Sequence, residues 1–151
     1  MRALLDVNVL IALLDGSHIH HGLASAWLAK NLAKGWASCP VTQNGCIRIL
    51  SQPGYPNSVP AAQAAGRLTE ATRHSSHAFW ADSISLLHPG RLMWDQVLSS
   101  RHVTDTYLLA LAVEHGGRFV TLDRGIPVGA VAGESANPSL TVASTFGRTP
   151  K

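Results

Sequence analysis

RALLDVNVLI, residues 2–11, is a short apolar run in which one carboxylate, that of Asp6, interrupts the hydrophobic residues. In an open α/β sheet the first strand lies centrally, and ligands bind just beyond the carboxyl ends of the strands. A carboxylate between Leu5 and Val7 is costly to bury without a cation or hydrogen-bond donors beside it. Asp6 is therefore the first candidate site residue, and the groups that pair with it decide the chemistry.

The composition indicates one compact domain. The chain has 151 residues, of which 46% are hydrophobic and 14% are charged, so it can bury a sizeable core without a linker. We expect the domain to span residues 1–146 and the remainder, 147–151, to form a short tail. The formal charge is +3 and the pI is about 9.2. This balance is compatible with a polyanionic partner but does not require one.

Two features predict a soluble, cytoplasmic protein. The longest mainly apolar run, Val7 to Leu14, includes the polar residue Asn8 and is far too short to cross a membrane. Cys39 and Cys46 lie close together in a chain with no recognisable cleavable leader, so we expect reduced thiols and the cytosol as the compartment.

Short apolar segments with strand character alternate with segments of helical periodicity along the chain. Ser17 and Thr42 are expected to cap the second and third helices. The predicted strands lie at 4–5, 36–40, within 79–87, at 118–123 and at 140–142; the predicted helices lie at 9–14, 17–32, 43–50, 60–73 and from 103 to the glycines at 116–117. This alternation predicts an α/β fold, with a central, mostly parallel sheet and helices on both faces.

Three aspartates fall where such a sheet binds its ligands. Asp6 ends the first strand, Asp123 ends a later strand, and Asp105 begins the helix that precedes that later strand. Three carboxylates brought close together repel one another unless a divalent cation neutralises them. Ligands that are all oxygen favour Mg²⁺ or Mn²⁺ over Zn²⁺.

The same segments carry a resemblance to a known family. LLDVNVLI (residues 4–11) is similar to the opening motif of the PIN domain, VTD (103–105) to its third acidic motif, and FVTLD (119–123) to its fourth. The chain resembles most closely the VapC-type toxin ribonucleases of bacterial toxin–antitoxin pairs. CPVTQNG (39–45) and the stretch from His18 to Trp27 are similar to a mycobacterial-type subgroup.

The resemblance implies a toxin that acts as a Mg²⁺- or Mn²⁺-dependent endoribonuclease. Such an enzyme hydrolyses RNA, with tRNA or rRNA as candidate substrates, leaves a 5′-phosphate, and inhibits translation and growth. The resemblance also implies two protein partners. One is a cognate antitoxin whose tail covers the acidic pocket and brings an arginine near the carboxylates, and the other is a second copy of the chain. The alanine-rich stretch from Pro60 to Ala71 is compatible with such a homodimer.

Roles for individual residues follow from the resemblance. Asp6, Asp105 and Asp123 would hold the metal ions, which activate a water and offset charge on the leaving oxygen. The polar neighbours expected to fix the carboxylate rotamers are Asn8, Thr104 and Thr121.

One position departs from the family pattern. Many PIN domains have a glutamate early in the third helix, whereas this chain has Asn44 and no acidic residue between Asp15 and Glu70. Asn44 can still offer a carbonyl oxygen or hold a metal-bound water, with weaker metal binding and slower turnover. Arg48 lies about one helical turn further on and is a candidate contact for an RNA phosphate.

Other interpretations remain open at this point. Asp105 alone is explained equally well as a residue that complements a helix dipole, and Asp123 alone as part of a turn. A catalytically weak or inactive module that binds antitoxin or RNA would explain the missing glutamate. A hydrolase forming an aspartyl-phosphate on Asp6 would need a proton donor two residues later, where Asn8 cannot serve.

Overall fold

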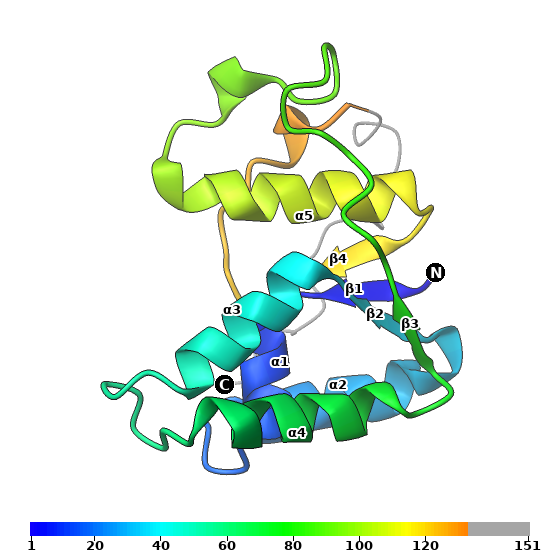
Figure 1. The fold of residues 1–151 in the computed structure, drawn as a ribbon. Coiled ribbons are helices and arrows are strands. Elements are labelled where there is room, and N and C mark those ends of the chain that lie inside the picture. The colour runs from blue at the N-terminus through cyan, green and yellow to red at the C-terminus, as the bar shows by residue number, and fades with distance from the viewer. Residues whose placement is uncertain (133–151) are drawn as a thin grey trace, which may run out of the picture.

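The computed structural model describes residues 1–132, which alternate between strands and helices as the sequence predicts (Figure 1). The strands are β1 (Ala3–Leu5), β2 (Trp36–Ser38), β3 (His77–Phe79) and β4 (Arg118–Val120). The α-helices are α1 (Val7–Leu14), α2 (His21–Asn31), α3 (Pro40–Leu50), α4 (Ala61–Thr72) and α5 (Val103–Glu114). Short 3₁₀ turns are η1 (Leu32–Lys34), η2 (Trp94–Gln96), η3 (Ser100–His102) and η4 (Val128–Ala130).

The four strands form one sheet in the order β3-β2-β1-β4, and each neighbouring pair runs parallel. Leu4 of β1 pairs with Ala37 of β2 on one side and with Phe119 of β4 on the other. The strand that opens the chain therefore lies inside the sheet, as the α/β prediction requires. Because all strands are parallel, their carboxyl ends share one edge, and this edge carries the candidate site.

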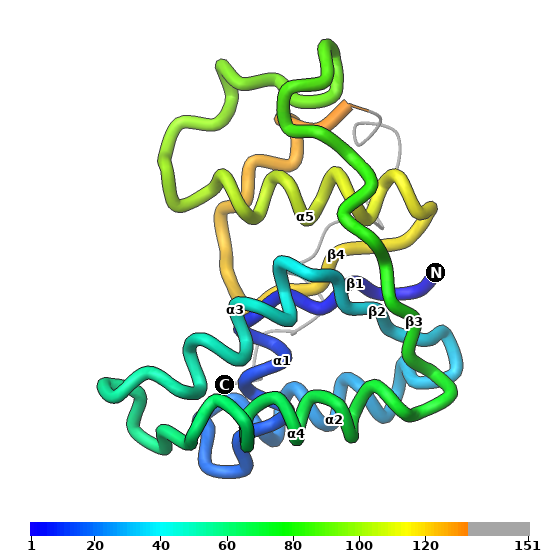
Figure 2. The backbone as a smooth tube through the Cα atoms, in the orientation of Figure 1, coloured from blue at the N-terminus to red at the C-terminus, as the bar shows by residue number. Residues whose placement is uncertain are grey.

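Helices cover both faces of the sheet, which confirms the predicted layers. In Figures 1 and 2, α5 lies on one side of the strands, and α1, α2 and α4 lie on the other. Side chains of β1 alternate between the faces, as strand geometry dictates. Leu4 and Phe119 pack in the core beneath α5, whereas Leu5 and Val120 pack in the core against α1, α3 and α4.

Two predicted helix starts are wrong. The third helix begins at Pro40 rather than after Thr42, and its N-cap is Cys39. Proline is favoured in the first turn because its missing N–H would have no partner there. Thr42, fully buried, instead accepts a hydrogen bond from the Cys39 N–H at 3.0 Å and so helps to cap the helix from within. Helix α2 begins at His21, so Ser17 is not its cap.

The third strand was expected within residues 79–87, but it is formed by His77–Phe79. The signal that misled the prediction was the apolar run Ile84–Leu87, of which Leu87 is 83% exposed. The expected strand at 140–142 and the expected domain boundary at residue 146 lie outside the described residues. Both cysteines are buried and unpaired, as expected of reduced thiols.

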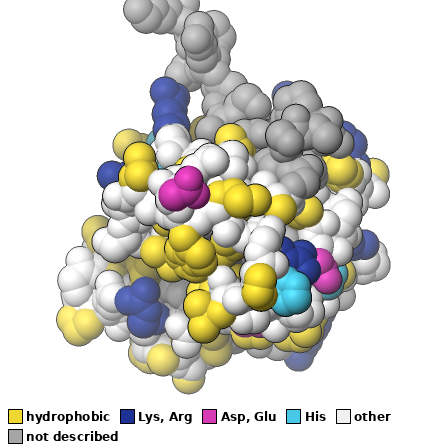
Figure 3. Space-filling model, turned by 90° about the horizontal axis from the view of Figure 1, so that it is seen from above, with side chains coloured by type: hydrophobic (Ala, Val, Ile, Leu, Met, Phe, Trp, Pro, Cys, Tyr) yellow, Lys and Arg dark blue, Asp and Glu magenta, His cyan; other side chains and the backbone are white. Residues whose placement is uncertain are grey.

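A long connection, residues 80–102, crosses the outer surface of α5 between β3 and the start of that helix (Figure 2). It leaves Leu87, Trp94 and Leu98 exposed. Viewed from that side, hydrophobic side chains gather near the middle of the face (Figure 3).

Across residues 1–132, every helix is too short or too polar to cross a lipid bilayer.

Candidate metal centre

Asp6 links the end of strand β1 to the start of helix α1. Its N–H donates to the Val120 carbonyl at 2.9 Å, which extends the pairing with β4 by one residue. Its carboxylate Oδ1 accepts from the Val7 N–H at 2.7 Å, so Asp6 also serves as the N-cap of α1. The chain turns from strand to helix at this residue, and the carboxylate is held at the carboxyl edge of the sheet with only 5% of the residue exposed.

The structure brings the three sequence-predicted aspartates together. One carboxylate oxygen each from Asp6, Asp105 and Asp123 lie within 4.8 Å of one another. Asp105 is buried in the first turn of α5, and Asp123 follows β4 and is exposed. Three separate segments of the chain thus supply oxygen ligands to one point, an arrangement able to hold a divalent metal ion.

The electrostatics of the cluster favour a cation. Burial, together with the negative charges of Asp105 and Asp123, raises the pKa of Asp6 from 3.8 to about 7, despite hydrogen bonds from Thr121 and Val7 that lower it. Burial and the charge of Asp123 likewise raise the pKa of Asp105, against the positive charges of His102 and Arg101. The hydrogen bonds therefore leave much of the carboxylate charge uncompensated. A divalent cation would supply the missing compensation.

A hydrogen-bond network beneath the cluster fixes Asp6. The Thr121 hydroxyl donates to Asp6 Oδ2 at 2.5 Å and accepts from the Asn8 Nδ2 at 3.0 Å and from the Asp123 N–H at 3.1 Å. Asn8 Oδ1 in turn accepts from the Leu122 N–H at 3.1 Å. One buried hydroxyl thus contacts two of the aspartates, and the supporting role of Asn8 and Thr121 stays a prediction.

A cavity of about 430 Å³ opens over the cluster. Its wall opposite α5 is formed by α3, from which Asn44 and Arg48 both line the cavity. Arg48 is exposed, and no acidic partner for its guanidinium lies within residues 1–132. The sequence expectation that Asn44 and Arg48 share one face near the carboxylates therefore agrees with their positions.

Helix α3 can reach the site because Gly45 lets it approach α1 closely. A Cβ atom at Gly45 would lie 2.6 Å from Val7 Cγ2, closer than atoms tolerate. Gly45 is buried between Asn44 and Cys46. Sequence reasoning missed this residue, although a glycine inside a helix is a signal of close helix packing.

Thr104 and Asp82 differ in their relation to the site. Thr104 lines the cavity, but its hydroxyl makes no hydrogen bond to a carboxylate among residues 1–132, so its supporting role stays a prediction. Asp82, an acidic residue in the connection that follows β3, lies against Tyr107, where burial and this carboxylate raise the tyrosine pKa. Asp82 does not belong to the cluster.

His102 is a further residue that sequence reasoning did not select. It ends η3, and its Nδ1 lies 3.9 Å from Asp105 Oδ2. The spacing of three residues before a helical aspartate is the signal that could have found it, since residues three apart on a helix share a face.

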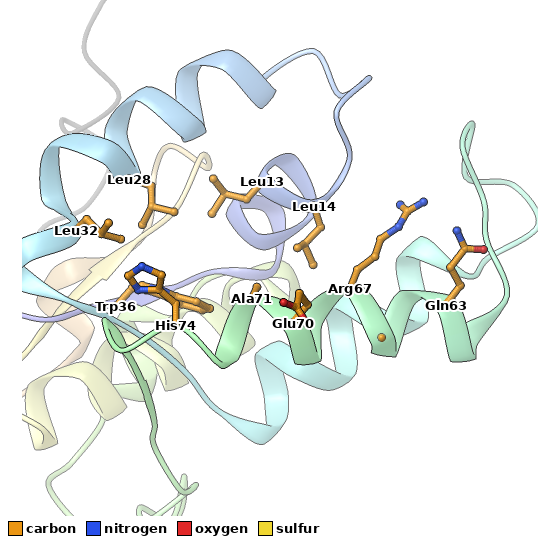
Figure 4. Close-up of a pocket in the computed structure, with 11 residues that line it drawn as sticks. Leu13, Leu14, Leu28, Leu32, Trp36, Gln63, Arg67, Glu70, Ala71 and His74 are labelled. Carbon is orange, nitrogen blue, oxygen red and sulfur yellow. The ribbon is translucent and has the colours of Figure 1, made fainter.

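A larger cavity in the described part of the chain, about 930 Å³, is a separate apolar groove. Figure 4 shows leucines of α1 and α2 facing side chains of α4 across it. None of its lining residues lines the cavity over the aspartates. Because the groove lacks any of the candidate catalytic groups, size does not identify the reactive site here.

Comparison with known proteins agrees with this geometry. Residues 3–131 match the family model of the PIN domain. Ribonuclease VapC44 of Mycobacterium tuberculosis is 50% identical over 133 residues, which cover 88% of this chain and 94% of that protein. Ribonuclease VapC39 of the same species is 41% identical over 134 residues, covering 88% of this chain and 96% of that protein.

Among solved structures, that of M. tuberculosis VapC20, described as a toxin that cleaves the sarcin–ricin loop, superposes with a TM-score of 0.53. The match covers 89% of this chain and 93% of that one at 11% identity, and it supports the fold alone.

The chain therefore belongs to the PIN-domain family. Within that family it belongs with the VapC ribonucleases, to which it is related over most of its length.

Proposed function

We propose that this chain is the toxin of a toxin–antitoxin pair and that it hydrolyses RNA with Mg²⁺ or Mn²⁺ bound by Asp6, Asp105 and Asp123. The observation that carries the proposal is the cluster itself: three carboxylates within 4.8 Å of one another, two of them buried with raised pKa values. A structural salt-bridge network would pair these acids with basic side chains. The positive charges of His102 and Arg101 do not outweigh the burial and the charge of Asp123, which raise the pKa of Asp105. The three carboxylates are therefore short of positive charge.

A bound divalent ion would act as a Lewis acid, lowering the pKa of the attacking water and offsetting charge on the leaving oxygen. The chain's own residues position the metal ligands and the substrate. Thr121 and the Val7 N–H fix both oxygens of Asp6. The exposed Asp123 lies where substrate enters, and Arg48 on the opposite wall binds a substrate phosphate. Asn44 contributes a neutral oxygen where a glutamate is usual, which favours weaker metal binding.

The proposed partners follow from the relatives and from charge. A cognate antitoxin inhibits the chain by covering the acidic cavity, with an arginine placed against the carboxylates. A second copy of the chain forms a homodimer through an apolar helix face, with the alanine-rich helix α4 as the candidate. Sedimentation as a monomer at micromolar concentration would remove the dimer from the proposal. The chain acts on its RNA substrate in the cytoplasm.

The activity is tested by incubating the purified chain, freed of any co-purifying protein, with total RNA and Mn²⁺ or Mg²⁺. We expect cleavage that EDTA stops. Asp6→Ala should lower the rate roughly 10²–10³-fold, the scale on which a metal contributes to transition-state stabilisation. Asp95→Asn is the matched control, because Asp95 is exposed and outside the cluster. Cleavage that persists in Asp6→Ala or in EDTA would overturn the proposal.

Because Asn44 stands where a glutamate is usual, a second candidate function is that of an inactive module that binds antitoxin or RNA. RNA binding without any cleavage at saturating Mn²⁺ would favour this alternative. The aspartyl-phosphate mechanism receives no support, because the Asn8 side chain is engaged with Thr121 and the Leu122 backbone. An amide held in this way is not a general acid.

A further inference from the structure

Asp105 differs from Asp6 in one respect that bears on metal binding. Both oxygens of Asp6 accept hydrogen bonds. The carboxylate of Asp105, with 12% of its side chain exposed, accepts none from any group in residues 1–132. A buried carboxylate without a donor is uncommon in folded proteins and calls for a partner.

The nearest candidate donor is the ring of His102. Its Nδ1 is buried, has no hydrogen-bond partner within the described part of the chain, and lies 3.9 Å from Asp105 Oδ2. That distance is too long for a hydrogen bond. A hydrogen bond between them requires the carboxylate or the imidazole ring to turn toward the other. Two groups that each lack a partner thus face one another beside the proposed metal centre.

The backbone of His102 is held firmly enough for its ring to have a defined direction. The Thr106 hydroxyl, fully buried, donates to the His102 carbonyl at 2.6 Å. The Ser99 side chain caps η3, the turn that ends at His102. The histidine and the aspartate then lie three residues apart on one face of the helical segment, where side chains meet.

We propose that His102 is a positioning residue for Asp105. Its Nδ1–H donates to Asp105 Oδ2 in the metal-loaded protein, which leaves the second oxygen of Asp105 free for the cation. The neutral ring suffices for this bond, because the Nδ1–H tautomer is a donor. The inference rests on the proposed metal centre. It adds a residue that acts on the metal ligand without touching substrate.

The test compares two amide substitutions of nearly equal chemistry. In His102→Asn the amide nitrogen occupies the position of Nδ1, whereas in His102→Gln it lies further out, near the position of Nε2. Mn²⁺ affinity of the purified full chain is measured from the free-ion EPR signal. We expect His102→Gln and His102→Ala to bind Mn²⁺ roughly 10–100-fold more weakly, and His102→Asn to stay within about threefold of the parent. His88→Gln, at an exposed position, is the matched control.

RNA cleavage by the same variants gives an independent readout. The loss of rate in His102→Gln should be recovered by raising Mn²⁺, since the histidine acts through metal occupancy. Asp105→Ala should not recover to the same extent, because it lacks the ligand itself. Thermal unfolding in EDTA shows whether each variant folds, and the comparison of the asparagine and glutamine variants stands even where the alanine variant fails to fold.

Each outcome decides between the claims. Equal Mn²⁺ affinity of the glutamine variant and the parent, with RNA cleavage intact, overturns the role of His102 and leaves the ribonuclease proposal standing. An asparagine variant as weak as the glutamine variant does the same. Tight Mn²⁺ binding that follows the predicted order without RNA cleavage would support His102 and contradict the ribonuclease. A parent chain that fails to bind Mn²⁺ at millimolar concentration would overturn both.

Discussion

The Thr121 hydroxyl donates to Asp6 Oδ2 at 2.5 Å, joining the ends of two neighbouring parallel strands across 115 positions of sequence. The Thr121 hydroxyl oxygen also accepts hydrogen bonds from the Asn8 amide and from the Asp123 N–H. A single buried hydroxyl therefore sets the rotamer of one proposed metal ligand and the backbone position of another. The precision of the site depends on this contact as well as on the acids themselves.

Thr121→Val should impair the site while keeping its shape. Valine fills the same volume but leaves the Asn8 amide and the Asp123 N–H without their acceptor. We expect a loss of about 1–3 kcal/mol in the free energy of unfolding and a roughly 10–100-fold weaker Mn²⁺ affinity. Urea unfolding and Mn²⁺ titration check these effects. Thr69→Val on the exposed face of α4 is the control, and equal behaviour of the two variants would refute the role of Thr121.

Asp6 should make the stability of the metal-free protein fall as pH rises. Its pKa is raised from 3.8 to about 7 in the folded chain, so between these values the folded state binds more protons than the unfolded state. The contribution of Asp6 is therefore most favourable below about pH 4 and is lost as pH approaches 7. Three pKa units correspond to about 4 kcal/mol.

The difference between parent and Asp6→Asn isolates this effect, because asparagine does not titrate. Urea unfolding in EDTA should show the parent losing stability relative to the variant across pH 4–7. Saturating Mn²⁺ should restore the parent above pH 7, where the carboxylate is ionised and free to bind it. Parallel pH profiles for the two proteins would contradict the raised pKa.

Much of the site was predictable because its acids occur at recognisable points of the chain. Asp6 and Asp123 each follow an apolar strand, and parallel strands bring such residues to one edge. Asp105 could be assigned because it opens a strongly periodic helix. The fold brings one carboxylate oxygen of each aspartate to within 4.8 Å of the others.

The parts that sequence reasoning missed are of two kinds: local signals that compete with one another, and contacts that only the folded chain makes. Thr42 resembles an N-cap, yet the helix starts at Pro40, three residues earlier than predicted, because proline fits the first turn. The apolar run at Ile84–Leu87 resembles a strand but lies in the connection over α5. Gly45 matters through its close approach to Val7 of another helix, and His102 matters through Asp105, which lies three residues further along the chain.

The close approach of α3 to α1 gives a test of how the cavity wall is positioned. Gly45→Ala places a methyl group against Val7 Cγ2, 2.6 Å away in the present packing. We expect a loss of about 1–3 kcal/mol in the free energy of unfolding from overpacking, with lower cleavage activity as Asn44 and Arg48 shift outward. Val7→Ala in the same chain should relieve the clash, and its failure to do so would exclude this steric explanation.

Arg48 should contribute to substrate binding rather than to the chemical step. Arg48→Gln is expected to raise KM for RNA with little change in kcat, since the guanidinium binds a phosphate that the reaction does not alter. For a single-stranded substrate, the slope of log affinity against log salt should fall by about 0.7 for the lost contact. Arg67→Gln, which lines the separate apolar groove, is the control. Equal slopes for the two variants would remove Arg48 from the RNA contact.

The central claim is that Asp6, Asp105 and Asp123 hold a divalent cation together. Anomalous diffraction from crystals grown with Mn²⁺, recorded near the manganese absorption edge, tests it most directly. We predict a peak between the three carboxylates, within about 2.0–2.4 Å of their oxygens, that disappears in Asp6→Ala crystals grown in the same way. A folded protein whose Mn²⁺ peaks all lie elsewhere, or whose acidic cluster stays empty at saturating Mn²⁺, would contradict the account.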